Sequence, residues 1–343
     1  MTRYKTVFTT ERGQRHQQAA LDAAPDNLEI TMLRQPSRET LLAHLADAVY
    51  LISERVGTMD AGLIQAAPKL KLIQRLGSLT YDIDLEAAQA AGVIVCYWPV
   101  GSVIRVAEHL MLQMLALSKK LRETEAIALA TSPVWGESKR TTEDTFAYNW
   151  SNRQNVEGLW QRTVGILGLG EIGAELARRL RGWDCPLLYH KRRRLPETVE
   201  AELGLTYVTL EDLLTQSDFL VNLLPYFSNT DLMINAAYFE RMKDGAYLVS
   251  CGSGSVINEA DLAAAVKSGK LGGAALDTFE WEPLKPDNPL IALAKANDNV
   301  LLTPHIAAGG SAAAARERLG DYTNLTRHIN GQPLRYVAGD GQG

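Results

Sequence analysis

Three glycines with the spacing of a nucleotide-binding turn carry the clearest chemical signal in this 343-residue chain. Gly168, Gly170 and Gly173 follow the apolar segment 164–167 and precede a predicted helix over 174–181. In dinucleotide sites the first glycine makes a tight turn, the second lets the backbone approach a pyrophosphate, and the third lets the helix pack on the strand. Glycine spacing alone is weak evidence, but the strand before it and the helix after it favour a dinucleotide site. The residues expected along the pyrophosphate are Gly168, Gly170, Glu171 and Ile172, and Gly173 belongs to the same cofactor-binding turn.

A basic run occupies the position at which such sites select between the two nicotinamide dinucleotides. NAD-specific sites place an acidic residue at the end of the second strand, about 20 residues after the glycines. Here the predicted strand 187–189 ends at His190, and no acidic residue follows directly. The next residues are Lys191, Arg192, Arg193 and Arg194. A ribose 2′-phosphate would be repelled by an acid and attracted by these cations. A basic run is usually only a solvated surface, but this position favours NADP over NAD, with His190, Lys191, Arg192 and Arg193 around the adenosine ribose.

The elements that must position these residues form two alternating series. The first series contains predicted strands at 5–8, 28–32, 48–51, 72–75 and 93–96, with helices at 38–46, 61–67 and 85–91. The second contains strands at 164–167, 187–189, 207–208, 219–223, 246–249, 273–276 and 300–302. Strands that alternate with helices predict parallel sheets with crossover helices. A helix over 311–329 and a short strand over 334–337 are predicted to end the chain.

Two further segments connect the series. Residues 106–130 have a helical apolar period without breakers, which predicts one long helix that links domains or packs against a second subunit. Residues 131–160 are polar with scattered aromatics and no clear period. We expect them to form an extended loop or arm, since unstructured loops of this length are usually functional or interfacial.

Composition excludes several classes of protein. The length predicts two domains, and 46% apolar with 22% charged residues is ordinary for a globular protein. A net charge of −5 argues against nucleic acid as a general partner. Three scattered cysteines predict neither a disulfide framework nor a metal cluster, and indicate a reducing compartment. With no apolar run that could span a bilayer and no secretion signal, we expect a cytoplasmic protein without a membrane partner.

From about Arg75 to Gly310, an ordered set of motifs resembles the D-isomer-specific 2-hydroxyacid dehydrogenase family. Besides the glycine turn, the motifs are DIDLEAAQAAGV (82–93), VAEH (106–109), LLP (223–225), MKDGAYLV (242–249), GAALDTFEWEPL (273–284) and NVLLTPHIAAG (299–309). The resemblance implies an α/β fold of two doubly wound parallel-sheet domains with a cleft between them. A flavodoxin-like substrate domain would comprise 1–105 and 306–343. An inserted Rossmann nucleotide-binding domain would comprise 106–305, including the crossover helix 106–130 and the arm 131–160.

The resemblance also implies roles for single residues. His305, in the TPH segment, matches the family's proton donor or acceptor, and Glu282 matches the carboxylate that is paired with it. Hydride transfer to a carbonyl makes an alkoxide that needs a proton, and an imidazole oriented by a carboxylate supplies one near neutral pH. A histidine at a strand end is by itself more often structural, but this pairing favours catalysis. Asp277 is expected near the nicotinamide amide, with a turn cap as the alternative. Pro225, Thr230 and Cys251 are expected to line the nucleotide, Cys251 as a small core filler and not as a nucleophile.

Three places on the substrate side depart from the family's pattern. Ser253 stands in the position of the arginine that clamps the substrate carboxylate in the family. A hydroxyl cannot replace the two charge-assisted bonds of a guanidinium, each of which contributes about 1.5–3 kcal/mol. Ser78 and Leu79 lie where the family has a backbone cradle for the carboxylate, with Leu79 in place of a glycine. Ser102 replaces an asparagine, and Arg105 replaces a small residue. Arg105 is either a substitute anchor for an acid group or a solvated helix residue.

These observations predict an NAD(P)-dependent oxidoreductase whose hydroxy or keto substrate is a small molecule, but not an ordinary short 2-hydroxy acid. The first alternative is a catalytically inactive NAD(P)-binding sensor or scaffold, and the presence of both His305 and Glu282 argues against it. A non-redox enzyme that uses bound nicotinamide transiently is a third class. The resemblance also implies a homodimer, because the crossover helix and the arm usually form the subunit contact in the family.

Overall fold

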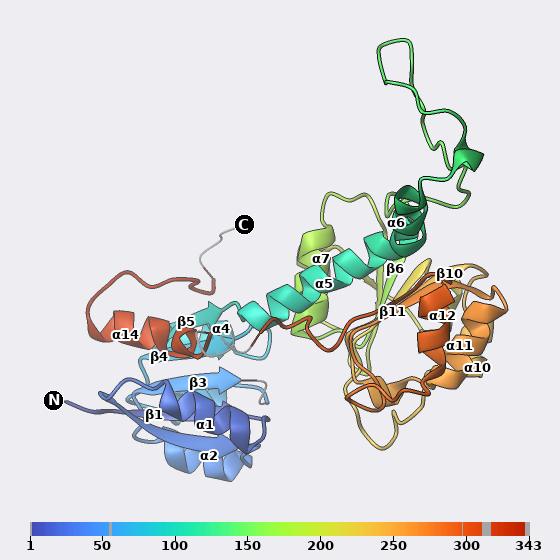
Figure 1. Ribbon diagram of the computed structural model, residues 1–343. Coiled ribbons are helices and arrows are strands. Elements are labelled where there is room, and N and C mark those ends of the chain that lie inside the picture. Colours follow the sequence, from blue (N-terminus) through green and yellow to red (C-terminus); the bar gives the residue numbers. More distant parts are fainter. Residues whose placement is uncertain (1, 55–56, 297, 311–316, 340–343) are drawn as a thin grey trace. The chain divides into compact units, whose positions relative to one another are not determined.

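The computed structural model divides the chain into two compact units (Figure 1). It describes residues 2–54, 57–296, 298–310 and 317–339. The first unit comprises Met1–Arg105 and Ala308–Gly343, and the second comprises Val106–Ala307. The boundaries predicted from the sequence are 105/106 and 305/306.

The first unit is built on a five-stranded parallel sheet with the strand order β2-β1-β3-β4-β5, which is the flavodoxin-like order. Its strands are β1 (Tyr4–Thr10), β2 (Leu28–Arg34), β3 (Tyr50–Glu54), β4 (Leu72–Leu76) and β5 (Ile94–Trp98). Its helices are α1 (Gln14–Asp22), α2 (Arg38–Leu45), α3 (Ala61–Gln65) and α4 (Leu85–Ala90), followed near the C-terminus by the 3₁₀ helix η3 (Arg318–Tyr322) and α14 (Thr323–Ile329). The side chains of Ser37, Asp60 and Asp84 cap the starts of α2, α3 and α4.

Successive strand residues of the first unit belong to two separate apolar cores, because side chains alternate across a sheet. Val7 and Leu51 pack with residues of α2, α3 and α4. Their neighbours Phe8 and Ile52 pack with residues of α1, η3 and α14. The C-terminal segment therefore completes a core that the first third of the chain begins.

The second unit contains a seven-stranded parallel sheet with the order β12-β11-β10-β9-β6-β7-β8. Its strands are β6 (Val164–Leu167), β7 (Leu187–His190), β8 (Leu205–Tyr207), β9 (Phe219–Asn222), β10 (Ala246–Ser250), β11 (Leu271–Leu276) and β12 (Val300–Leu302). The connecting helices are α7 (Glu171–Leu180), α8 (Glu197–Leu203), α9 (Leu210–Gln216), α10 (Ala236–Arg241), the 3₁₀ helix η2 (Gly254–Val256), α11 (Glu259–Lys267) and α12 (Pro289–Ala296). The order reverses between β6 and β9, where ligands bind in doubly wound sheets.

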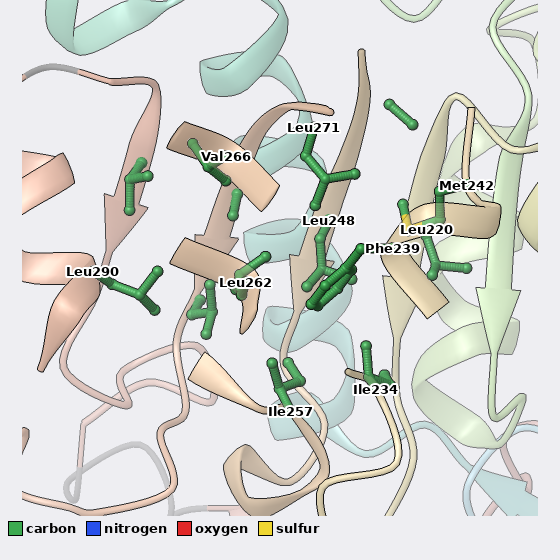
Figure 2. Close-up of a cluster of buried hydrophobic side chains, with 14 of the residues drawn as sticks. Leu220, Ile234, Phe239, Met242, Leu248, Ile257, Leu262, Val266, Leu271 and Leu290 are labelled. Atoms are coloured by element: carbon green, nitrogen blue, oxygen red, sulfur yellow. The ribbon is translucent and has the colours of Figure 1, made fainter. Parts of the chain in front are cut away.

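One continuous core stabilises the half of this sheet that contains β9, β10 and β11 (Figure 2). Leu220 and Leu248, on β9 and β10, lie among Phe239 of α10, Leu262 of α11 and Leu290 of α12. All five side chains are at most 1% exposed. The predicted pair of doubly wound parallel sheets is confirmed.

The predicted single helix over 106–130 is wrong, because the segment forms two helices. The first, α5 (Gly101–Ser118), begins five residues earlier than predicted, and α6 (Leu121–Ala130) follows it. Lys120 adopts a left-handed conformation with φ +47° and ends the first helix. The Thr124 hydroxyl lies 3.1 Å from the carbonyl oxygens of Lys120 and Leu121. No residue of α6 is buried, so core packing does not hold the segment in one straight helix.

The remaining predicted elements are only partly regular. In the arm, Pro133–Trp135 form a 3₁₀ turn (η1), and Trp135 contacts Trp150 edge to face at 5.9 Å. The predicted helix over 311–329 begins outside the described residues, and its described part is η3 followed by α14. The predicted strand over 334–337 is a single bridge between Val337 and Cys96.

Candidate functional site

The glycine turn has the local geometry that a pyrophosphate site requires. Gly168 has φ +88°, and a Cβ there would lie 3.0 Å from the backbone carbon of Leu223. A Cβ on Gly173 would lie 3.3 Å from Cγ2 of Ile166 on β6, so helix and strand are in close contact. A Cβ on Gly170 would meet no atom within 4 Å. The direction in which a side chain of Gly170 would point is therefore open, which leaves the backbone there accessible to a ligand.

The start of α7 is also suited to an anion. Gly170 is the N-cap residue, and no side chain caps the first turn, which begins with Glu171 and Ile172. The N–H groups of a helix start attract negative charge when no side chain satisfies them. These residues thus fit the pyrophosphate of a dinucleotide.

The end of β7 is joined directly to this turn. The backbone N–H of Gly168 donates to the carbonyl of His190 at 3.0 Å. The His190 ring stacks on Tyr207, and its Nδ1 lies 2.9 Å from the carbonyl oxygen of Val208. The basic run that begins at Lys191 therefore leaves the sheet beside the glycine turn, as expected for residues around an adenosine ribose.

A tight turn follows β9 on the other side of β6. The Thr230 hydroxyl donates to the carbonyl of Pro225 at 3.0 Å and accepts from the backbone N–H of Phe227 at 2.8 Å. Thr230 is 9% exposed, whereas Phe227 is 47% exposed. Thr230 thus fixes the turn that presents Phe227. Phe227 is not among the residues predicted for the nucleotide site, although two adjacent aromatic residues, Tyr226 and Phe227, directly follow the LLP motif.

The structure places the two predicted proton-transfer residues in contact. Nδ1 of His305 lies 2.7 Å from Oε2 of Glu282. The other carboxylate oxygen of Glu282 accepts the backbone N–H of Phe279 at 3.0 Å. An ionised carboxylate only accepts, so Nδ1 carries the hydrogen and Nε2 is left for a substrate. The His305 side chain is 59% exposed, which gives Nε2 access to a small molecule.

Asp277 holds the segment that carries His305. Its carboxylate accepts the backbone N–H groups of Ile306 at 3.0 Å and Ala307 at 2.9 Å. It also accepts the Thr303 hydroxyl at 2.6 Å, and that hydroxyl lies 3.0 Å from Nε2 of His109. His305 has φ +53°, which is uncommon for a residue with a side chain, and these bonds fix the turn around it. The turn-cap alternative for Asp277 thus has direct structural support.

A buried amide lies beside Cys251, at the end of β10. Gln113 of α5 is fully buried, and Sγ of Cys251 lies 3.6 Å from its Oε1. The side-chain nitrogen of Gln113 has no hydrogen-bond partner among the described residues. Burial raises the pKa of the Cys251 thiol, which fits a packing residue better than a nucleophile.

The residue in the family's arginine position lies in a crowded backbone segment. The backbone N–H of Ser253 donates to the carbonyl of Leu224 at 2.9 Å. A Cβ on Gly254 would lie 2.0 Å from the backbone of Phe279, and one on Gly252 would lie 2.9 Å from the Leu224 carbonyl oxygen. These contacts fix the backbone on both sides of Ser253. The side chain that this segment carries is the short hydroxyl of Ser253, which is half-buried.

Arg105 and Ser102, in the first unit, both bind Glu317. Nη2 of Arg105 lies 2.9 Å from the Glu317 carboxylate, and its Nε donates to the carbonyl of Ala308 at 2.6 Å. The hydroxyl and the backbone N–H of Ser102 donate to the same carboxylate at 2.8 and 2.9 Å. Arg105 is therefore already paired with an acid, so its role as a substitute anchor stays a prediction.

The other two substrate-side residues lie in the loop after β4. Leu79 is 5% exposed, so its side chain is part of the protein interior. Ser78 is half-buried. Neither position contradicts the predicted loss of the carboxylate cradle, which also stays a prediction.

Residues 2–54, 57–296, 298–310 and 317–339 contain neither a candidate metal site nor a candidate membrane span. In that part of the chain, no group of three or more His, Cys, Asp or Glu residues has the geometry to hold a metal ion. No helix there has the length and apolar character needed to cross a bilayer.

Comparison with known proteins identifies the family. The D-isomer specific 2-hydroxyacid dehydrogenase, NAD binding domain, matches residues 111–307. The D-3-phosphoglycerate dehydrogenase of Archaeoglobus fulgidus is 31% identical over 321 residues, which cover 90% of this chain and 55% of that protein. The glyoxylate reductase of Thermococcus onnurineus is 35% identical over 301 residues, which cover 86% of this chain and 84% of that protein.

A solved structure agrees with these matches. A crystallised protein of Pyrococcus horikoshii superimposes with a TM-score of 0.58 at 26% identity, covering 99% of this chain and 96% of that one. The chain spans about half the length of the phosphoglycerate dehydrogenases that it matches. With a family match over more than half of its residues, this chain belongs to the D-isomer specific 2-hydroxyacid dehydrogenase family.

Proposed function

We propose that this protein is an NAD(P)-dependent oxidoreductase that acts on a CH–OH group or on the corresponding carbonyl. The observation that carries the proposal is the contact of 2.7 Å between His305 and Glu282, in the same unit as the glycine turn. A bound nicotinamide supplies or accepts the hydride. His305 handles the proton that must move with it.

The chain's own residues account for the proton step. When an alcohol is oxidised, its C–H bond yields the hydride and its O–H proton passes to Nε2 of His305. Glu282, bonded to Nδ1, stabilises the imidazolium that forms. In the reverse direction, the same Nε2–H protonates the developing alkoxide. Asp277 positions His305 through the bonds to Ile306 and Ala307.

The cofactor that we propose is NADP in preference to NAD. The support is the basic run from Lys191 to Arg194 at the end of β7, with no acid at His190. An acid there would bind the ribose hydroxyls of NAD, whereas cations favour the additional phosphate of NADP. Comparing KM for the two cofactors tests this assignment, and a clear preference for NAD would reject it.

The substrate that we propose is not an ordinary short 2-hydroxy or 2-keto acid. Ser253 offers one hydroxyl where the resemblance leads us to expect a guanidinium clamp for a carboxylate. Ser253→Arg should therefore raise kcat/KM for glyoxylate by about tenfold or more. Full activity of the unmodified protein on glyoxylate or hydroxypyruvate would refute this part of the proposal.

The proposed assembly is a homodimer that uses the arm, whose Phe146 and Tyr148 are more than 80% exposed. Side chains of this size that protrude into solvent are typical of surfaces that another chain covers. The cytoplasmic location expected from the sequence stays a prediction.

Steady-state assays of His305→Ala and Glu282→Gln test the activity itself. We expect kcat to fall by about 10²–10⁴-fold in the first variant and by a smaller factor in the second, with cofactor binding unchanged. Turnover that is unaffected by His305→Ala would refute the mechanism. Cofactor binding without turnover across a broad panel of alcohols and carbonyls would instead support the inactive sensor or scaffold.

A further inference from the structure

A histidine of α5 contacts the turn of residues 303–307, which carries His305. Nε2 of His109 lies 3.0 Å from the hydroxyl oxygen of Thr303 and 3.7 Å from Oδ1 of Asp277. The side chain of His109 is 10% exposed and that of Asp277 is 1% exposed, so both groups are largely removed from water. The proposed proton transfer uses His305 and Glu282 and gives His109 no task.

The hydrogen atoms of this network can point in only one direction. The Thr303 hydroxyl has a single hydrogen, and its contact of 2.6 Å with Asp277 uses it, because an ionised carboxylate only accepts. The Thr303 oxygen must therefore accept from His109. It follows that Nε2 of His109 carries a hydrogen, whatever the state of Nδ1.

Both partners of His109 bind the backbone around His305. The carbonyl of Thr303 accepts the backbone N–H of His305 at 2.9 Å. Asp277 accepts the backbone N–H groups of Ile306 and Ala307 at 3.0 and 2.9 Å. His305 has φ +53°, a conformation that residues with a side chain rarely adopt. The network thus holds the backbone at His305 and directly after it.

The helix that carries His109 is fixed by packing. Ala107, Leu110 and Met114 of α5 are fully buried, and close-packed side chains resist displacement. Asp277 directly follows β11 and Thr303 directly follows β12, and these strands are neighbours in the sheet. His109 therefore joins a fixed helix to the carboxyl ends of two adjacent strands.

We propose that His109 is a positioning residue for the proton transfer. It donates from Nε2 to Thr303, and through Thr303 and Asp277 it sets the orientation of His305. The proposal rests on the proposed function, in which His305 carries the proton, and it assigns His109 no contact with the substrate. The alternative is a direct ion pair of His109 with Asp277, which would depend on the charge of an imidazolium and not on the hydrogen bond to Thr303.

Nuclear magnetic resonance of the unmodified protein, labelled with ¹⁵N-histidine, tests the direction of the network without a substrate. The ring signals of His109 are identified by their loss in His109→Gln. We expect a hydrogen on Nε2 of His109 at every pH at which the protein is folded. A neutral ring with its hydrogen on Nδ1 would overturn the proposal. Because this measurement uses the unmodified protein, it does not depend on the stability of any variant.

Four variants separate the donor from the charge. His109→Gln keeps an N–H donor without a charge, whereas His109→Leu has neither, and Thr303→Ser keeps the hydroxyl that Thr303→Val lacks. The amide hydrogens of Ile306 and Ala307 should exchange about tenfold faster in His109→Leu and Thr303→Val, and at the original rate in the other two variants. Exchange in His109→Gln as fast as in His109→Leu would favour the ion pair and overturn the proposal.

Steady-state kinetics measures whether this positioning affects the reaction. With the best substrate of the panel of alcohols and carbonyls, kcat should fall about tenfold in His109→Leu and Thr303→Val, with KM for the cofactor changed less than twofold. Thr303→Ser should restore kcat. The double variant should be no slower than the slower single variant, because both substitutions break the same path. Thr215→Val, which removes an exposed hydroxyl from α9, is the control and should leave kcat unchanged.

The outcomes separate this inference from the proposed function. If the unmodified protein turns over a substrate and His109→Leu keeps its full kcat, His109 is not a positioning residue, while the proposed function stands. If turnover is unaffected by His305→Ala, the proposed function fails, and the task of His109 in proton transfer fails with it. If the unmodified protein turns over no substrate, the exchange rates decide, and unchanged exchange in His109→Leu and Thr303→Val would overturn the network.

Discussion

At the scale of single residues, the candidate site depends on how a few carboxylates are used. Glu282 has one oxygen bound to the backbone and the other to His305, so it cannot rotate without breaking a bond. Asp277 is 1% exposed and accepts from two backbone N–H groups and one hydroxyl. One carboxylate thus orients the imidazole, and the other fixes the backbone that carries it.

The first prediction concerns Asp277→Asn. The amide can accept one of the two backbone N–H groups, but its own N–H₂ would face the other donor. We expect the free energy of unfolding to fall by about 1–3 kcal/mol, since a buried donor loses its acceptor. Urea denaturation checks this value. Asp287→Asn, at an exposed position in the same unit, is the control and should leave stability unchanged.

The second prediction concerns the pH dependence of stability and Asp321. Burial raises the pKa of Asp321 to about 6, with Glu54 and Glu317 acting in the same direction and Arg318, 2.8 Å away, opposing them. The folded state therefore binds this proton more tightly than the unfolded state, in which the pKa is about 3.9. The stabilisation is fully present below about pH 4 and is lost as the pH rises through 6.

Asp321→Asn removes this proton equilibrium. We expect the stability of the variant relative to the unmodified protein to rise by about 3 kcal/mol between pH 4 and pH 7. Urea denaturation at several pH values measures the difference. A difference that stays constant over this range would show that Asp321 titrates at its ordinary value.

At the scale of elements, the break between α5 and α6 shows that an apolar period predicts helical structure but does not predict where one helix ends and the next begins. The apolar period of residues 106–130 continues through the break, and neither glycine nor proline marks it. The break occurs at Lys120, whose backbone is left-handed. Lysine is a good helix former, so its residue type does not predict this conformation. Most strands could be predicted to within two residues, because each is a short apolar run bounded by polar residues.

The third prediction follows from that break. A left-handed conformation costs a residue with a side chain about 1 kcal/mol, and glycine adopts it without that cost. Lys120→Gly should therefore raise the free energy of unfolding by about 0.5–1 kcal/mol, measurable as a higher melting temperature. Lys119→Gly should lower it, because Lys119 is not among the residues with positive φ. Equal effects of the two variants would contradict this explanation.

At the scale of the whole molecule, the order of motifs predicted both sheets and the pairing of His305 with Glu282. The family's pattern assigned those two residues, and the contact between them agrees with it. The contact of Arg192 with Phe227 could not be predicted, because it depends on where two loops meet after folding. The Arg105–Glu317 pair is separated by more than 200 residues, so local patterns could not indicate that Arg105 already has an acid partner.

The fourth prediction concerns the arm and the proposed dimer. Phe146 and Tyr148 stack on each other and are 82% and 83% exposed, so they contribute little to the stability of the isolated chain. The double variant Phe146→Ser, Tyr148→Ser should weaken the dimer at least tenfold. Light scattering over a dilution series measures this change. Glu137→Gln, also on the arm and exposed, should not affect assembly. A variant dimer as tight as the original would remove the arm from the interface.

The hydrogen bond from Arg105 to Ala308 bears on how the second unit could be inserted into, or removed from, the first unit. These are the residues at which the first unit is interrupted and resumed, and the Nε of Arg105 donates directly to the carbonyl of Ala308. The two cut ends of the interrupted unit are thus held next to each other. A gene that splices residue 105 to residue 308 would need only a minimal joint, and other nucleotide-binding modules could be grafted at the same place.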